Sequence, residues 1–431
     1  MMKKIIFITL LFIPLCGFAQ QKWTLQQCVD TALVHNWNVK KYDLSSQSKK
    51  ISYDQSRQNL LPSVNASVGQ NFNYGRSLTV NNVYESTNSK QTSLGVSANV
   101  TLFDGLKMKY NIEARNADLK ASYSEKQLQQ DNVKVNVSQA YLQVLLDKEL
   151  LRIANDQLAL TQSKIEMQKS LVANGKLAEG EVYSLQAQAG KEELNRTRAD
   201  NTLKLDLLIL AQIMVVNVEN FDVDVPENFP EQELQLISAE AIYLSAITHR
   251  PEIKGAEYRL LSSQKDVLVN KATAYPTLSF GANTGSGYYN MSNNLNSPFS
   301  DQLKNNWSSS LGFTLSIPIF NKFQIHNSVK QAQLAVESSK VDLSMAKDDL
   351  KKSIQQAYFN AVAAKARWEA AQKSEVAAKE AYRFANQKYE SGRASLYDLY
   401  QAKSDLTQVL SEKSQAKFEY IFRMKLLELL K

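Results

Sequence analysis

Cysteine and histidine are scarce in this sequence, and their scarcity excludes several kinds of chemistry. The 431 residues include 2 cysteines, Cys16 and Cys28, and 3 histidines, which stand far apart. Because Cys28 is the one cysteine outside the N-terminal signal described below, no intramolecular disulfide is expected, and a packing role is predicted for it. We find no cluster of metal ligands, no nucleophile beside a base and no phosphate-binding glycine loop. The sequence therefore predicts neither an enzyme nor a bound cofactor or metal.

Long hydrophobic runs and strong charge clusters are also missing. After the first twenty residues there is no apolar run of about 18 residues, so a membrane-spanning helix is not expected. The 50 Lys and Arg nearly balance the 43 Asp and Glu, which leaves a formal net charge of +7. No basic cluster stands out as a nucleic-acid footprint, so nucleic acid is not an expected partner.

Proline and glycine are absent from two long stretches, residues 106–174 and 323–391. Each stretch is long enough for about 100 Å of helix at 1.5 Å per residue. In the second stretch alanine recurs every seven residues, at Ala357, Ala364, Ala371, Ala378 and Ala385. A heptad repeat of small residues predicts left-handed coiled-coil packing with close contact between helices.

The first twenty residues have the pattern of an export signal. Lys3 and Lys4 precede an apolar stretch, and a small-x-small site ends at Ala19, so we predict a signal peptide at 1–19. A lipoprotein is a weaker interpretation, because Pro14 before Cys16 is not the small residue that such a site requires.

The rest of the sequence is duplicated. Tyr141 in a Gln-Ala-Tyr triplet recurs as Tyr358, and Gly175 in a polar break recurs as Gly392, each 217 residues later. Each copy is too long for a solenoid repeat, so the pattern predicts a doubled half-protein. The predicted boundaries are 20–216 for the first repeat, 217–236 for a linker and 237–431 for the second repeat.

Each half contains two segments in which apolar and polar residues alternate. Such a period of two predicts strands with one apolar face and one polar face. The polar faces consist of Ser, Asn, Gly and Thr, without charged residues. The predicted strands are residues 63–75, 92–103, 277–285 and 307–317, with outer loops at 75–91 and 285–306.

Three details favour a membrane barrel over a soluble sheet, which would also alternate. A length of about ten residues suits a tilted membrane strand. Uncharged polar faces suit a water-filled lumen, and Tyr74, Tyr288, Tyr289 and Trp307 fall near segment ends, where interfacial aromatic residues belong. Four strands cannot close a barrel, so the chain must share one with copies of itself. Two copies give eight strands and three give twelve, and the strand count does not choose between them.

The order of helices, strands and turns, found twice, resembles the TolC family of outer-membrane efflux proteins. The resemblance covers essentially the whole chain after the signal. The residues that carry it are Ala32-Leu33-x-His35-Asn36, its copy Ala246-Ile247-x-His249-Arg250-Pro251, the break at Pro62, Phe103-Asp104-Gly105, and Tyr389-x-x-Gly392-Arg393 followed by Asp398-Leu399.

The resemblance implies an α+β membrane protein of the Gram-negative outer membrane. Three copies would form a twelve-stranded β-barrel continuous with a long α-helical tunnel in the periplasm. The implied partners are outer-membrane lipid, a periplasmic adaptor (membrane fusion) protein and an inner-membrane pump of the RND, ABC or MFS class. The implied function is the exit channel of a tripartite efflux or type I secretion system.

The resemblance also assigns a periplasmic constriction to residues around the second glycine turn. In the family, acidic residues form rings just after this turn, and Asp398, six residues after Gly392, matches the first acidic position. Gln401 stands where the family has a second acidic residue, which lowers the expected charge of the ring. Tyr389 and Arg393 belong to the same segment. Asp398 has a second interpretation, as a first-turn helix carboxylate favoured by the helix dipole.

Gly175 and Gly392 are expected to supply the positive φ angle that ends a helix and reverses the chain. The resemblance implies that these two helix-hairpin tips contact the adaptor. Glu181 is included with them, because it holds in the first repeat the position that Asp398 holds in the second.

Two other functions are weighed against the exit channel. A passive outer-membrane pore would need the strands, but it has no use for helices about 100 Å long. A structural spacer of the cell envelope would need the helices, but it has no use for two pairs of amphipathic strands.

Overall fold

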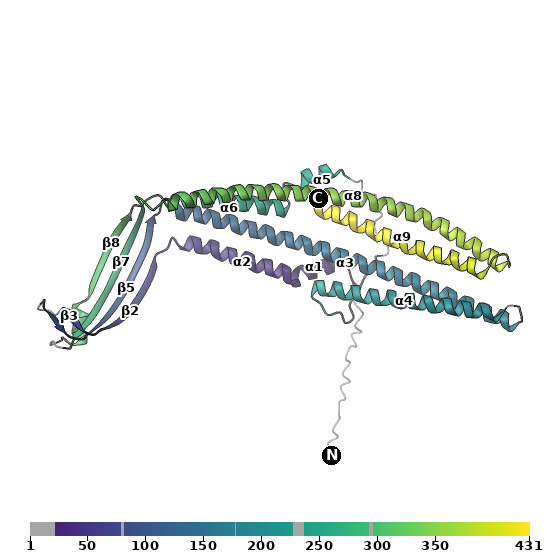
Figure 1. Ribbon diagram of the computed structural model, residues 1–431, viewed down its shortest axis with the longest axis horizontal. Helices are drawn as coiled ribbons and strands as arrows, with labels where there is room; N and C mark the ends of the chain where they lie inside the picture. The colour runs from purple at the N-terminus through teal and green to yellow at the C-terminus, as the bar shows by residue number, and fades with distance from the viewer. Residues whose placement is uncertain (1–21, 79–81, 177, 227–236, 293–295) are drawn as a thin grey trace, which may run out of the picture. The chain divides into compact units, whose positions relative to one another are not determined.

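A computed structural model of the chain describes residues 22–78, 82–176, 178–226, 237–292 and 296–431 (Figure 1). The predicted signal peptide at 1–19 lies outside the described residues, as does the second part of the predicted linker, 227–236. The chain divides into two compact units, each built from both halves of the sequence. Unit 1 comprises Met1–Lys41, Gln129–Ala246 and Leu350–Lys431, and unit 2 comprises Tyr42–Leu128 and Ile247–Asp349.

The two longest helices confirm the prediction made from the missing proline and glycine. Helix α3 spans Lys107–Ala173 and helix α8 spans Gln324–Glu390, and each has 67 residues. Each long helix follows a strand and precedes a shorter helix, α4 (Glu179–Met214) or α9 (Leu396–Leu430). Among the helices of the described residues, none combines the length and the apolar composition that a membrane crossing requires.

Unit 2 contains a four-stranded antiparallel sheet. Its strands are β2 (Ser63–Asn73), β5 (Ser89–Phe103), β7 (Thr277–Met291) and β8 (Ser308–Ser316). They pair in the order β2-β5-β7-β8, so a strand of the first half pairs directly with one of the second (Figure 1). Within this sheet β2 and β8 are edge strands with one paired side each.

The register of the sheet places the apolar residues of all four strands on one face. Ala66 pairs with Val96 between β2 and β5, and Phe280 pairs with Phe313 between β7 and β8. The last two rings lie 5.1 Å apart between centroids. No described part of the chain covers this apolar face, because Val68 is 77% exposed and the β8 side chains are exposed throughout. The period-two pattern therefore produces the expected two-faced sheet.

The predicted outer loops contain more structure than expected. In the first, β3 (Arg76–Leu78) pairs with β4 (Tyr84–Ser86), and β5 begins at Ser89 rather than at 92. In the second, β7 continues to Met291 rather than ending at 285, and α7 spans Phe299–Asn305. The longer β7 is possible because Gly285 and Gly287 lie close to the backbone of β5, where a larger side chain would crowd it.

Ion pairs connect the helices of unit 2. Helix α6 spans Pro251–Ala272, and its Asp266 accepts from Arg115 of α3 at 3.1 Å. Lys265 of α6 contacts Glu113 of α3 at 2.7 Å. These pairs are partly exposed, so each contributes about 1 kcal/mol or less.

Unit 1 holds the main hydrophobic core. Helix α1 (Leu25–His35) packs in it against α3, α4 and α9 and against the short parallel pair of β1 (Lys22–Trp23) and β6 (Asp222–Val223). The fully buried side chains of this core are Cys28, Ala32, Val137, Val144, Leu210, Met214 and Val223. Burial raises the pKa of the Cys28 thiol to about 12, and its place in the core confirms the predicted packing role.

Two helical stretches of the chain are interrupted. The first divides at Asn36 into α1 and α2 (Trp37–Gln58). The Asn36 amide donates to the Ile213 carbonyl at 3.0 Å and accepts from the Asn38 backbone at 2.9 Å, which holds the backbone extended there. The second stretch divides between α5 (Ala239–Ala246) and α6, because Pro251 begins α6 and cannot continue a preceding helix.

Candidate functional site at the helix-hairpin turns

The first turn joins α3 to α4 through Gly175. Gly175 has a φ of +69°, and its backbone N–H donates to the Val172 carbonyl at 2.8 Å. The next residue, Lys176, donates to the Leu171 carbonyl at 2.9 Å. This pair of bonds is a Schellman motif, which satisfies the last carbonyls of a helix and reverses the chain.

The second turn joins α8 to α9 and repeats this geometry. Gly392 has a φ of +71°, and it donates to the Tyr389 carbonyl at 2.9 Å. Arg393 donates through its backbone to the Lys388 carbonyl at 2.8 Å, while its side chain is exposed. The role in chain reversal that the sequence predicts for both glycines is confirmed.

Asp398 caps the helix that follows the second turn. The Ser395 backbone N–H and hydroxyl donate to the Asp398 carboxylate at 3.0 and 2.7 Å, and the Asp398 backbone donates back to the Ser395 hydroxyl at 3.2 Å. This reciprocal arrangement is a capping box. The bonds from Ser395 hold the pKa of Asp398 below its usual value, so the carboxylate is charged at neutral pH. The side chain is exposed, and its place in a ring of copies stays a prediction.

Glu181 has the same position in α4 but a different partner. The N-cap of α4 is Ala178, which has no hydroxyl to form a capping box. The Glu181 carboxylate instead accepts from the Tyr389 hydroxyl of α8 at 3.0 Å. The same hydroxyl accepts from the Gln168 amide of α3 at 2.8 Å. Gln168, Glu181 and Tyr389, which we call the tip cluster, therefore connect the first hairpin to the second.

Electrostatics keep the Tyr389 hydroxyl protonated. Burial, the bond to Glu181 and the charge of Glu181 raise the pKa of Tyr389 to about 12. The hydroxyl is therefore a stable donor to the carboxylate throughout the physiological pH range. Beside it, Lys164 of α3 donates to the Asn386 amide oxygen of α8 at 2.6 Å, which adds a second polar contact between the hairpins.

Asp405, an acidic residue that was not predicted as part of the site, lies with Gln401 on the exposed side of α9. The Gln401 amide donates to the Asp405 carboxylate at 2.9 Å. Asp398, Gln401 and Asp405 are spaced i, i+3 and i+7, which places them on one face of the helix. The spacing is visible in the sequence, so Asp405 could have been found by continuing the stripe from Asp398.

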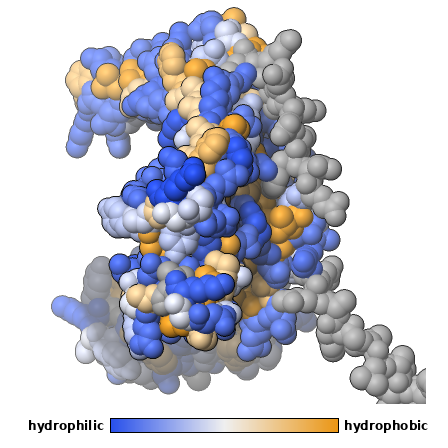
Figure 2. Space-filling view, turned by 90° about the vertical axis from the view of Figure 1, so that its right-hand side faces the viewer, coloured by the Kyte–Doolittle hydropathy of each residue, from blue (hydrophilic) through white to orange (hydrophobic). Residues whose placement is uncertain are grey.

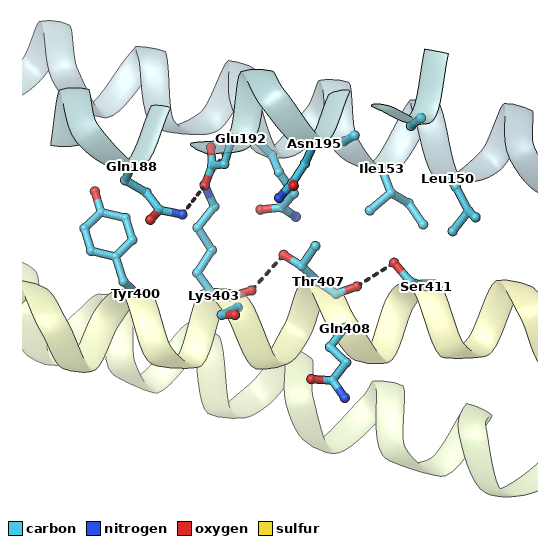
Figure 3. Close-up of a pocket in the computed structure, with 14 residues that line it drawn as sticks. Leu150, Ile153, Gln188, Glu192, Asn195, Tyr400, Lys403, Thr407, Gln408 and Ser411 are labelled. Atoms are coloured by element: carbon cyan, nitrogen blue, oxygen red, sulfur yellow. Dashed lines mark hydrogen bonds and ion pairs between the residues drawn. The ribbon is translucent and has the colours of Figure 1, made fainter. Parts of the chain in front are cut away.

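The buried ion pair of Lys403 and Glu192 was also not predicted from the sequence. Lys403 of α9 is 4% exposed, and its ammonium group donates to the Glu192 carboxylate of α4 at 2.9 Å (Figure 3). The signal was a charged residue between Leu399 and Leu406 in the buried stripe of α9. Such a residue requires a partner of opposite charge.

The surface around the turns is mainly hydrophilic. Figure 2 looks onto the right-hand side of Figure 1, and it shows separate hydrophobic areas within a polar surface. Two tyrosines near the turns are exposed, Tyr183 at 65% and Tyr397 at 74%. Among the residues that the structure describes, no group of three or more His, Cys, Asp or Glu is placed to hold a metal ion.

The class of the protein follows from a comparison with protein families. The sequence model of the family described as "Outer membrane efflux protein" matches residues 28–214 and 242–421, which include both turns and all four strands of the sheet. The chain belongs to this family, and the outer membrane is its location.

Individual proteins show the same relationship. The outer membrane protein TolC of Escherichia coli is 23% identical over 97% of this chain and 84% of its own length. SilC of Salmonella typhimurium, a probable outer membrane lipoprotein, is 24% identical over 74% of this chain, and the match spans 66% of SilC. The outer membrane channel CmeC of Campylobacter jejuni has the same fold, with a TM-score of 0.79 at 18% identity over 94% of this chain and 85% of CmeC.

Proposed function

We propose that this chain is the outer-membrane exit channel of a tripartite efflux or type I secretion system. Substrates would pass to it from an inner-membrane pump through a periplasmic adaptor and leave the cell through its barrel. One observation carries the proposal: a sheet with an uncovered apolar face joins directly to two 67-residue helices. An apolar face suits lipid, and helices of about 100 Å reach far beyond a bilayer.

The proposed assembly is a homotrimer with a twelve-stranded barrel. Strands β2 and β8 are edges in the single chain, and an open edge in hydrocarbon costs several kcal/mol for each unpaired group. Pairing β2 of one copy with β8 of the next removes all edges when the ring closes. The family relationship favours three copies over two.

The tip cluster suits a role in closing the periplasmic end. Its bonds connect the α3–α4 hairpin to the α8–α9 hairpin through Glu181 and Tyr389, which are partly buried, and through Gln168, which is buried. Breaking such bonds in water costs little, about 0.5–3 kcal/mol, since water replaces the lost partners. The turns at Gly175 and Gly392 and the nearby Glu181 are the proposed contacts for the adaptor, whose binding would separate the hairpins.

Asp398, Gln401 and Asp405 form the proposed constriction stripe, with Arg393 and Tyr389 beside it. Three copies of two carboxylates around an axis would attract cations. The capping box fixes the Asp398 side chain, so its charge would stand at a defined height in the tunnel. The proposed transport needs no catalytic step in this chain, because the energy comes from the pump.

Conductance in planar bilayers tests this function. The purified oligomer should give small, discrete, cation-preferring channels in a salt gradient. Asp398→Asn keeps an acceptor for Ser395 but removes the charge, and Asp405→Asn removes the second charge. Both should shift the reversal potential toward zero, whereas the control Asp156→Asn, at an exposed position on α3, should not.

Two results would contradict the proposal. A correctly assembled oligomer that gives no conductance would favour the structural spacer. A large conductance that is always open and unchanged by the Asp398 and Asp405 substitutions would favour the passive pore.

A further inference from the structure

The feature that the proposed function leaves unused is the buried lysine of α9. Lys403 lies between Leu399 and Leu406 in the stripe of α9 that faces the rest of unit 1. An apolar residue is expected at such a position, and an unpaired ammonium group there would be costly. A lysine in this place therefore depends entirely on what surrounds its Nζ atom.

All three donor positions of the Lys403 ammonium group are used. It donates to the Glu192 carboxylate of α4 at 2.9 Å and to the Gln157 backbone carbonyl of α3 at 3.0 Å. It also donates to the Thr161 hydroxyl of α3. One side chain of the second hairpin thus bonds to both helices of the first hairpin. We call Lys403, Glu192, Thr161 and Gln157 the lysine layer.

Glu192 is satisfied from within the first hairpin. Its carboxylate accepts from the Thr161 hydroxyl at 2.6 Å and from the Gln188 amide at 3.0 Å, and Figure 3 shows it directed at Lys403. Thr161 and Gln188 therefore hold the Glu192 carboxylate in position without any contribution from Lys403. Burial lowers the pKa of Lys403, while the bond to Glu192 opposes that change.

The lysine layer lies where the contacts on α3 change in character. On one side, Val137, Val144 and Leu145 of α3 belong to the apolar core. On the other, Lys164 and Gln168 of α3 add polar contacts with α8 to the buried apolar side chains of Ile165, Leu185 and Leu399. Separating apolar helices exposes hydrophobic surface to water, whereas separating polar groups allows water to replace their partners.

A cavity beside the lysine layer gives water a place next to the ion pair. It has a volume of about 360 Å³ and is lined by residues of α3, α4 and α9, among them Lys403, Glu192 and Tyr400. Within the described part of the chain, the Tyr400 hydroxyl and the Gln157 amide oxygen are buried without a hydrogen-bond partner. Water entering here could hydrate both charges as the helices part, which would offset the loss of the ion pair.

We propose that the lysine layer is a second, inner contact of the closed channel, which sets the position of α9 against α3 and α4 and opens by hydration. The inference rests on the proposed function and extends it. The part of the second hairpin that moves during opening would extend from the turn at Gly392 as far as Lys403. A buried ion pair suits this task, since it favours one arrangement strongly while adding little net stability.

A pair of variants separates this role from simple folding support. Lys403→Met leaves Glu192 buried without its cation, so it should lower the melting temperature and raise the open probability. Lys403→Met combined with Glu192→Gln removes both charges. The new amide keeps an oxygen acceptor for Gln188 and has an NH2 group that can donate to the Thr161 hydroxyl, so the melting temperature should recover. The open probability of the double variant should stay raised by roughly tenfold, because the contacts between the hairpins are still missing.

The matched control is Lys413→Met. Lys413 also lies on α9 and contacts Glu375 at 2.6 Å, but Glu375 belongs to α8 of the same hairpin. Lys413→Met should therefore leave the open probability of the channel at its wild-type value.

The outcomes distinguish a failure of the inference about the lysine layer from a failure of the proposed channel function. A double variant that recovers both stability and wild-type open probability would overturn the inference and leave the exit channel standing. An equal rise in Lys413→Met would also overturn it, because any lost lysine would then suffice. If the wild type forms no channel, the proposed function fails and the inference fails with it.

Discussion

The two hairpin turns use equivalent carboxylates in opposite ways. Glu181 and Asp398 stand 217 residues apart, at the same position of α4 and α9, and each follows a glycine with nearly the same φ angle. Asp398 binds Ser395 of its own helix, whereas Glu181 binds Tyr389 of the other hairpin. The backbone of the two turns is conserved between the repeats, and the side-chain contacts are not.

The difference follows from one residue, the N-cap. Ser395 offers a hydroxyl and so engages Asp398, while Ala178 offers nothing and leaves Glu181 to reach Tyr389. After duplication, therefore, a carboxylate could be retained at one site for helix capping and at the other for contact between hairpins. Three predictions test this comparison, beginning with the largest expected effect.

A buried carboxylate that lacks a hydrogen-bond donor such as Ser395 or Tyr389 should destabilise the fold when it is ionised, unlike Asp398 and Glu181. Asp147 of α3 is 3% exposed and accepts from the Gln143 amide at 3.1 Å, and its second carboxylate oxygen is buried without a hydrogen-bond partner among the described residues. Burial and Asp206 raise its pKa to about 7. A raised pKa stabilises the fold below the unfolded value near 4, and this stability is lost as the pH rises through about 7.

Asp147→Asn should therefore stabilise the protein at pH 8 by roughly 2–4 kcal/mol and less at pH 5. Thermal unfolding at the two pH values measures this, with the exposed Asp156→Asn as control. An advantage of Asp147→Asn that is equal at both pH values would show that Asp147 is ionised in the folded protein.

Removing the N-cap hydroxyl at the second turn should have a smaller effect. Ser395→Ala should cost about 1 kcal/mol, because the first turn of α9 loses its capping box. Hydrogen exchange should rise in that turn, and denaturant unfolding gives the free energy. The control Ser411→Ala removes a hydroxyl from the middle of α9 and should cost less. Equal costs would mean that the capping box contributes nothing special.

The comparison can also be reversed by giving the first turn a hydroxyl. Ala178→Ser should let Glu181 form a capping box, which would stabilise the start of α4 by about 0.5–1 kcal/mol. The same change should draw Glu181 away from Tyr389, so the channel should open more often although the protein is more stable. Bilayer recordings and melting curves check the two effects. A more stable channel that opens less often would contradict the competition for Glu181.

Local features of this protein were predictable from its sequence. The long helices follow from the absence of proline and glycine, and the turns follow from Gly175 and Gly392 within polar breaks. The strand faces follow from strict alternation. The extension of β7 through Tyr288 and the helix break at Asn36 were not predicted, because they depend on contacts with β5 and with the Ile213 carbonyl.

The candidate site was predictable as a set of positions but not as a set of contacts. Tyr389 and Glu181 were both named from the sequence, yet their bond joins residues 208 positions apart, which no local pattern encodes. Asp405 could have been found from its spacing to Asp398. Lys403 could have been found as a charge in a buried stripe, but its partners Glu192 and Thr161 required the packing of three helices.

The most direct test of the account is the open probability of single channels of wild type and Tyr389→Phe in planar bilayers. We expect a mostly closed wild type and a rise of roughly tenfold in the open probability of Tyr389→Phe, because the Tyr389 hydroxyl donates to a charged group. Tyr397→Phe, at the exposed tyrosine of the same turn, should match the wild type. Equal open probabilities in wild type and Tyr389→Phe would contradict the claim that the tip cluster holds the channel closed.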